Sequence, residues 1–289
     1  MFFMKRLLVC IDGSSPYTES CLKYTQWLLE KTQAGADILY VSDTHLFNVS
    51  MLADISGSLG VQPYQGLYSQ LKEVETQKVR VIKKSALDFF KNNHLEQRVN
   101  FHNMEGLLVD AYESFENNEV GLDLVIVGKR GEDADFASEH LGSSMERLVR
   151  ASQKPCLVVP RKYIPIKHVL IAYDGSPSVN KAIQFFVRSP LFKDVQLDLV
   201  MVTEEDNASG EQNNLMNKAL QALKEAHYNV HAEILSGDPS DTIVNYSLKN
   251  NIDLLVMGAY GHSAIRHLLI GSTTTDLMRR CKFSVLLFR

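Results

Sequence analysis

Residues 252–289 read IDLLVMGAYGHSAIRHLLIGSTTTDLMRRCKFSVLLFR: an apolar run, spaced glycines, a hydroxyl cluster, a helix-like segment and a second apolar run. Residues 122–161 follow the same plan as LDLVIVGKRGEDADFASEHLGSSMERLVRASQKPCLVVPR. Earlier in each copy, KRLLVCIDGSS at 5–15 returns as KHVLIAYDGSP at 167–177. A duplicated unit indicates the same arrangement of helices and strands twice. We therefore expect two domains, at residues 1–162 and 163–289.

The two copies differ in length. Their Asp-Gly-Ser runs lie 162 residues apart, whereas Gly128 and Gly258 lie only 130 apart, so the first copy is longer by about 32 residues. The surplus falls around residues 44–70, where Gly, Ser and Pro predict a long loop. A loop of this length is typical of a lid, an interface element or a mobile segment, and all three remain open.

Apolar runs alternate with amphipathic segments in each copy. In the second copy we predict strands near 167–173, 196–203, 229–236, 252–257 and 283–288, and helices near 178–188, 211–226, 239–250 and 272–281. The strand-like runs are apolar throughout, as strands buried on both faces are. This pattern predicts an α/β fold: two Rossmann-like domains, each an open five-stranded parallel sheet with helices on both faces.

Composition narrows the class of function. The net charge is −4 and the pI is about 6.1, which argues against nucleic-acid binding. No apolar run reaches 18 residues, so we expect a cytoplasmic protein without a membrane partner. Four cysteines lack metal-binding spacing, and His227 and His231 span a predicted helix-to-strand boundary, so we expect no metal site.

Glycines and hydroxyls after the fourth strand of the second copy predict a phosphate site. Gly258 and Gly261 leave the backbone free of side chains, so that a ligand can approach closely. Gly271 then precedes a cluster of hydroxyl residues at a helix start, where free N–H groups favour an anion. The same residues also suit a simple helix cap, which is the commoner use of Ser and Thr at this place.

The spacing G-x2-G-x9-G-S, joined to a strand-terminal YDGS, resembles the universal stress proteins, and specifically their ATP-binding branch in tandem form. The resemblance covers nearly the whole chain. It implies the adenine nucleotide alpha hydrolase-like variant of the Rossmann-like fold in both copies. It also implies ATP as the ligand, with Mg²⁺ held through the phosphates.

The resemblance further implies a set of nucleotide-binding positions in the second copy. They are Ala172 and Asp174 at the adenine, Val202 at the base through its backbone, Met257, Gly258 and Gly261 at the ribose and phosphates, His262 at a phosphate oxygen, and Gly271, Ser272 and Thr273 around the phosphates. Two of these have alternatives. His262 also suits a solvated loop, and Asp174 suits a turn in which its side chain bonds its own backbone.

The first copy departs from this pattern. Its spacer between Gly131 and Gly142 carries four carboxylates, Glu132, Asp133, Asp135 and Glu139. Each would repel a nearby phosphate by about 1–4 kcal/mol, although Lys129 and Arg130 could offset part of this. The GDP turn at 237–239 also has only GLL at 106–108 as its counterpart. We predict that the second domain binds ATP and that the first binds it weakly or not at all.

Two classes of function suit such a protein. One is a stress-response regulator in which ATP favours one conformation that a protein partner, still unknown, recognises. The other is a slow ATPase or phosphotransferase, but no Lys, Arg or acid has the spacing that phosphoryl transfer needs, so we assign no catalytic residue and expect at most weak hydrolysis. A nucleotide-free scaffold is a third alternative.

The last strand of each copy predicts how the copies associate. CLVVP at 156–160 and SVLLF at 284–288 are apolar and would close their sheets as exposed edges, which favour pairing. We expect the two copies to pack against each other as an intramolecular pseudo-dimer. Homodimerisation of two chains remains open as well.

Overall fold

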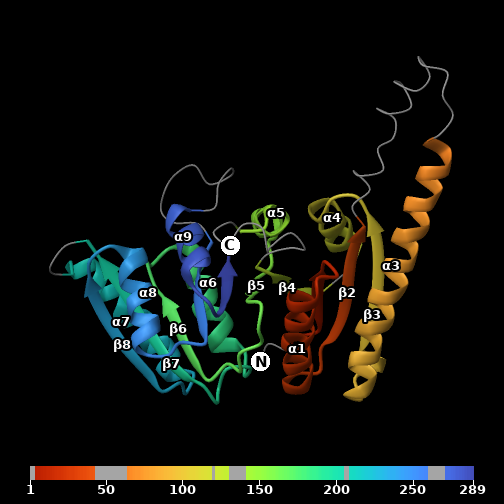
Figure 1. Cartoon of the computed structure of the whole chain (residues 1–289). Helices are drawn as coiled ribbons and strands as arrows, with labels where there is room; N and C mark the ends of the chain where they lie inside the picture. The colour runs from red at the N-terminus through yellow and green to blue at the C-terminus, as the bar shows by residue number, and fades with distance from the viewer. Residues whose placement is uncertain (1–3, 43–63, 119–120, 130–140, 205–207, 260–270) are drawn as a thin grey trace.

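The computed structural model describes residues 4–42, 64–118, 121–129, 141–204, 208–259 and 271–289, with the side chains of residues 64–68 and 118 left aside. Figure 1 shows a broad sheet with helices on both sides. The first half contributes strands β1 (Arg6–Ile11), β2 (Gly35–Ser42), β3 (Val99–Glu105), β4 (Leu122–Gly128) and β5 (Cys156–Val159). The second half contributes β6 (His168–Ala172), β7 (Gln196–Thr203), β8 (Val230–Ser236), β9 (Leu254–Gly258) and β10 (Ser284–Phe288).

The strands form a single sheet of ten in the order β3-β2-β1-β4-β5-β10-β9-β6-β7-β8. All pairs within each half are parallel, as the continuous apolar runs predict. The two halves join where β5 and β10 pair antiparallel, with Leu157 opposite Leu286. The apolar edge strand of each copy is therefore paired with that of the other copy, about a pseudo-two-fold axis at these two leucines.

Eight α-helices cover the sheet in the described part of the chain. They are α1 (Ser15–Lys31), α3 (Tyr64–Asn92), α4 (Leu108–Asn118), α5 (Ser143–Ala151), α6 (Pro177–Arg188), α7 (Gly210–Glu225), α8 (Pro239–Lys249) and α9 (Ser272–Arg280), with a short 3₁₀ turn at Glu96–Arg98. Buried side chains of α1, α3, α6 and α7 form one core on one face of the sheet. Those of α4, α5, α8 and α9 form a second core on the other face. Each core crosses both halves.

The second half matches the sequence prediction closely, since each of its strands and helices lies within two residues of the predicted bounds. The first half corrects one prediction. Residues 64–70, expected in a loop, begin the 29-residue helix α3, while residues 44–63 lie outside the described part. Between Tyr64 and Asn92 the chain has no proline and is rich in Gln, Leu, Lys and Glu, which favour helix. The corresponding helix of the second copy, α7, has only 16 residues. Part of the extra length of the first copy is therefore a longer helix.

The segment that connects the halves is held by a buried tyrosine. Tyr24 of α1 donates its hydroxyl hydrogen to the carbonyl oxygen of Ile164 (3.0 Å), and the N–H of Ile164 donates back to the same hydroxyl (3.1 Å). The ring of Tyr163 packs edge-on against that of Tyr24, with centroids 4.7 Å apart. The connection is thus fixed to the first half by both packing and hydrogen bonds. The domain boundary at residues 162 and 163 remains a prediction.

Candidate functional site

The carboxyl ends of three neighbouring strands in the second half bring several predicted site residues together. β6 lies between β7 and β9, with Ile171 opposite Val256 and Ala172 opposite Val200. The chain runs outward from β6 to β8 and returns to β9 on the other side, so the strand order reverses between β6 and β9. Open sheets of this kind bind ligands at such a point, beyond the carboxyl ends of the strands. Ala172 and Val202, both half-buried, end β6 and β7 there, and Asp174 is exposed.

The beginning of α9 returns to the end of β9. The N–H of Gly271 donates to the carbonyl oxygen of Ala259 (3.4 Å), and the hydroxyl of Thr274 donates to that of Gly258 (3.2 Å). Ala259 and Gly271 therefore lie side by side at the end of β9. Thr274 is buried by this contact, while Ser272 and Thr273 are exposed. The sequence marked the hydroxyl cluster but did not distinguish Thr274, which anchors the helix.

The N-terminus of α9 differs from the other helix starts in its half. Ser176, Ser209 and Asp238 each accept a hydrogen bond from a backbone N–H at the start of α6, α7 and α8. α9 follows Gly271 and has no side-chain cap. Its first N–H groups therefore have no capping side chain from Gly271, and they lie beside two exposed hydroxyls at the sheet edge where ligands bind.

One predicted residue, Met257, does not join this group through its side chain, and two others are not described. The side chain of Met257 is only 6% exposed and belongs to the core beneath α8 and α9, so only its main chain could reach a ligand. Gly261 and His262 lie outside the described residues.

Asp174 has the structural role that the turn alternative predicts. Its Oδ1 accepts a hydrogen bond from the N–H of Ser176 (2.9 Å), and Gly175 between them has a φ of +74°. The first half repeats the turn, with Asp12 Oδ1 accepting from the N–H of Ser14 (3.0 Å) and Gly13 at a φ of +82°. In both halves, the aspartate after the first strand therefore holds this turn. Any contact of Asp174 with a ligand would be additional to it.

The first half differs at the corresponding site. The N–H of Gly142 donates to the carbonyl of Lys129 (3.2 Å), so α5 starts as α9 does, but Lys129 stands where the second half has Ala259. The Lys129 side chain is 8% exposed, and its ammonium group donates to the carbonyl oxygens of Cys281 and Arg279 (3.4 Å to the latter) in the second half. These partners lie at the C-terminal end of α9, away from the hydroxyl cluster at the N-terminal end of that helix. Arg130 and the four carboxylates of the spacer lie outside the described residues.

The described residues offer little nucleophilic or metal chemistry. Burial raises the pKa of the Cys156 thiol to about 12 and that of Cys281 to about 11, and it also raises the pKa of Cys10 and Cys21. None of these thiols is therefore ionised near neutral pH. In the same part of the chain, no group of three or more His, Cys, Asp or Glu side chains could hold a metal ion. No helix there is long and apolar enough to cross a membrane.

Comparisons with known proteins agree with this architecture. A model of the Universal stress protein family matches residues 4–160 and again residues 165–289. Universal stress protein Slr1230 of Synechocystis sp. is 37% identical over 293 residues, which cover 99% of this chain and all of that protein. Among solved structures, a universal stress protein from Archaeoglobus fulgidus superposes with a TM-score of 0.72 at 18% identity, covering 100% of this chain and 99% of the other. A putative universal stress protein from Pseudomonas aeruginosa gives a TM-score of 0.60 at 15% identity, covering 99% and 93%. The chain therefore belongs to the universal stress protein family and carries two of the family's domains in tandem.

Proposed function

We propose that the second domain binds ATP and that the protein acts in the cytoplasm as a stress-response regulator, through its conformation or through a protein partner. The observation that carries this proposal is the position of the α9 N-terminus against the end of β9, the strand that pairs with β6. The contacts of Gly271 with Ala259 and of Thr274 with Gly258 hold the uncapped helix start at that edge. A polyanion is the ligand that such a helix start favours.

The residues present suit an adenine nucleotide in chemistry as well as position. Ser272 and Thr273 are exposed and add hydroxyl donors to the free N–H groups of α9. Half-buried Ala172 and Val202 offer an apolar surface and backbone groups for a base. One oxygen of Asp174 is used in its turn, and the carboxylate can still accept from an exocyclic amine. Mg²⁺ would reach the protein through the phosphates.

The first domain is proposed to bind ATP weakly or not at all. Lys129, the first residue after β4, donates to main-chain carbonyls of the second half. The turn before α8 begins with Asp238, which caps that helix through the N–H of Asp241 (2.9 Å), and the first half has Leu107 in its place. The two domains thus share a scaffold but differ around the predicted phosphate position.

A pair of matched variants tests the proposal. Ser272→Asp places a carboxylate at the start of α9, where it favours the helix dipole but repels a phosphate. Ser143→Asp makes the same change at the corresponding place of the first half, since Gly142 and Gly271 precede the two helices. We expect calorimetric titration with ATP to give one site per chain in the unmodified protein and in Ser143→Asp. We expect at least a tenfold weaker site in Ser272→Asp. Equal affinity in the two variants would refute the location.

Slow hydrolysis or phosphoryl transfer is the alternative function, and turnover separates it from regulation. With Mg²⁺ present, a rate orders of magnitude above that of a Gly261→Val variant would favour the enzyme. A rate at the level of that variant, together with ATP binding, would favour the regulator. If the folded chain binds no adenine nucleotide, the scaffold alternative holds.

A further inference from the structure

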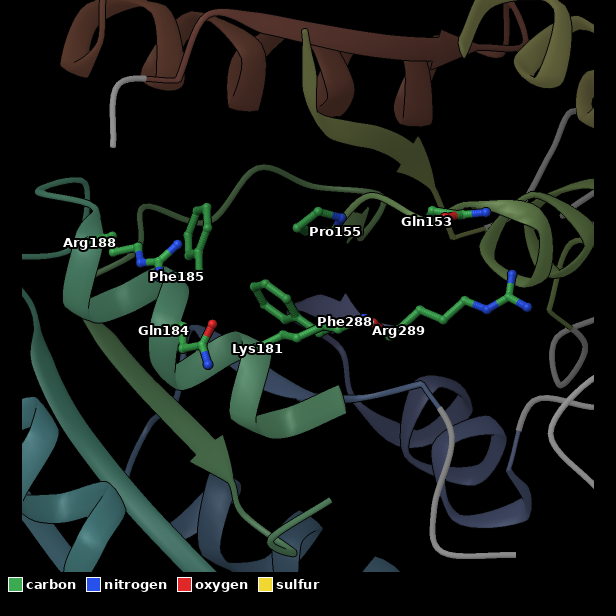
Figure 2. Close-up of a pocket in the computed structure, with 8 residues that line it drawn as sticks. All are labelled: Gln153, Pro155, Lys181, Gln184, Phe185, Arg188, Phe288 and Arg289. Carbon is green, nitrogen blue, oxygen red and sulfur yellow. Dashed lines mark hydrogen bonds between the residues drawn. The ribbon is translucent and has the colours of Figure 1, made fainter. Parts of the chain in front are cut away.

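A cavity of about 220 Å³ opens at the junction of the two halves, away from the predicted nucleotide site. Figure 2 shows Gln153 and Pro155, from the segment before β5, on one side of it, and side chains of α6 and β10 on the other. Its aromatic residues Phe185 and Phe288 pack with the core beneath α1 and α6. α9 lies on the opposite face of the sheet, and no predicted nucleotide-binding residue within the described part of the chain lines the cavity.

The inner wall of the cavity is apolar and aromatic. The rings of Phe185 and Phe288 have centroids 5.5 Å apart, and Figure 2 shows both beside the open space that Pro155 closes from the first half. Phe288 is 3% exposed and fixed in β10, whereas Phe185 is half-buried on α6. Such a wall favours a flat ring or a short acyl chain.

The rim of the cavity is cationic. Lys181, Arg188 and Arg289 line it, and among the residues that the structure describes no Asp or Glu side chain does. The ammonium group of Lys181 donates to the main-chain oxygen of Arg289 (2.7 Å), a contact that uses one of its three N–H donors. Arg188 is exposed and makes no hydrogen bond or ion pair with any residue that the structure describes. An anion at the rim would therefore meet the guanidinium group of Arg188 and the remaining N–H donors of Lys181 without displacing an Asp or Glu side chain of the described residues.

The corresponding place in the first half lacks these features. At the 162-residue offset, Lys181, Phe185 and Arg188 correspond to Glu19, Lys23 and Gln26 of α1. Lys23 pairs with Glu19 there (2.6 Å). Phe288 lies opposite Gly258 in its sheet pairing, and Val159 lies opposite Gly128 in the equivalent pairing. The aromatic wall and cationic rim are thus particular to the second half and do not follow from the duplicated scaffold.

We propose that this cavity binds a small organic anion, with an aromatic ring or short acyl chain against Phe185 and Phe288 and a carboxylate, sulfonate or phosphate group at Arg188 and Lys181. The cavity volume is about the volume that seven water molecules occupy in liquid water. It suits one or two rings and is below the usual size of a pocket for a whole nucleotide. The ligand would touch both halves, because Pro155 and Gln153 come from the first and the other lining residues from the second.

Two probes that differ in charge test this site. The full chain is titrated calorimetrically with naphthalene-1-sulfonate and with neutral 1-naphthalenemethanol. We expect one sulfonate per chain and at least tenfold weaker binding of the alcohol. Arg188→Gln should weaken sulfonate binding about tenfold, as the loss of one half-solvated ion contact does. Lys23→Gln, which removes a cation at the corresponding part of α1, should leave the affinity unchanged. Arg188 is exposed and the side chain of Lys23 is 43% exposed, so neither change should unfold the protein.

Each remaining outcome overturns the proposal. The first is that no sulfonate binds at millimolar concentration. The second is that Arg188→Gln and Lys23→Gln lose the same amount of affinity for the sulfonate. The third is that saturating ATP displaces the sulfonate. The last outcome would place the probe in the nucleotide site. A chain that binds the sulfonate but no ATP would support the cavity and refute the proposed function, so the two can fail separately.

Discussion

Lys129 of the first half donates a hydrogen bond to the carbonyl oxygen of Cys281, the residue that ends α9 in the second half. The reverse contact is also present, since Arg289 donates to the carbonyl oxygens of Arg150 (2.6 Å) and Ala151 (3.4 Å) at the end of α5. Each half thus places a cation at the negative end of the other half's glycine-preceded helix. Helices α5 and α9 are therefore tied across the junction at their C-termini.

Replacing Lys129 with Met should lower the free energy of unfolding by about 1.5–3 kcal/mol, the usual contribution of a hydrogen bond to a charged group. Methionine keeps most of the buried volume, so the loss reports the contacts with Cys281 and Arg279. Lys282→Met is the matched control, because Lys282 is exposed and next to Cys281. Urea unfolding would measure both. Equal midpoints for the two variants would contradict this account of the junction.

Gly175→Ala should destabilise the second half by about 1–2 kcal/mol, because alanine strongly disfavours a φ of +74°. The added methyl would also lie 2.9 Å from Cδ1 of Leu215, which is the end of a flexible side chain and can move. Gly210→Ala is the control, since no atom lies within 4 Å of its added methyl and the residue begins α7. Thermal unfolding should show a lower midpoint temperature for Gly175→Ala and an unchanged one for Gly210→Ala.

Tyr24→Phe should cost about 1–2 kcal/mol, because it removes both hydrogen bonds to Ile164 in the connecting segment. Tyr163→Phe keeps the ring that packs on Tyr24 and should change stability by less than about 0.5 kcal/mol. Burial raises the pKa of Tyr24 to about 12, above the value near 10 of an unfolded tyrosine. The neutral phenol is thus favoured in the folded state, and its contribution is complete below pH 10. The advantage of the unmodified protein over Tyr24→Phe should shrink between pH 10 and 12.

Arg6→Met should lower stability at neutral pH by about 2–4 kcal/mol, because it leaves the buried Asp37 carboxylate without its closest cation (2.5 Å). Burial alone would raise the pKa of Asp37, but hydrogen bonds from Arg6 and His102 outweigh it and lower the pKa. The contribution of Asp37 is therefore present above the unfolded pKa near 3.9 and is lost as pH falls below it. Arg6→Met should remove this acid dependence in denaturant titrations. An unchanged pH profile, or an equal loss in the exposed neighbour Lys5→Met, would argue against it.

The strands and helices of the second half were predictable because burial on both faces leaves continuous apolar runs between amphipathic segments. The start of helix α3 was not predictable from the sequence. Its side chains at Val74 and Val81 are 66% and 67% exposed, so little burial pattern marks this part of the helix. The pairing of Leu157 with Leu286 followed only in outline from two apolar edge strands, since a sequence does not give their register.

The candidate site was predictable where glycines and hydroxyls mark a backbone requirement. The position of Gly271 at the start of α9 follows from the sequence, whereas the burial of Thr274 beside exposed Ser272 depends on how the helix rotates against β9. Contacts across the junction were beyond sequence reasoning. Lys129 lies about 150 residues from Cys281, and their meeting depends on the antiparallel joining of the two sheets.

The most direct measurement of the central claim is native mass spectrometry of the full chain titrated with ATP and Mg²⁺. The account predicts one ATP per chain in the unmodified protein and in Ser143→Asp, and a strongly reduced ATP-bound fraction in Ser272→Asp at the same concentration. Two ATP molecules per chain would contradict the difference between the domains. A folded chain without bound ATP at saturating concentration would contradict the binding claim itself.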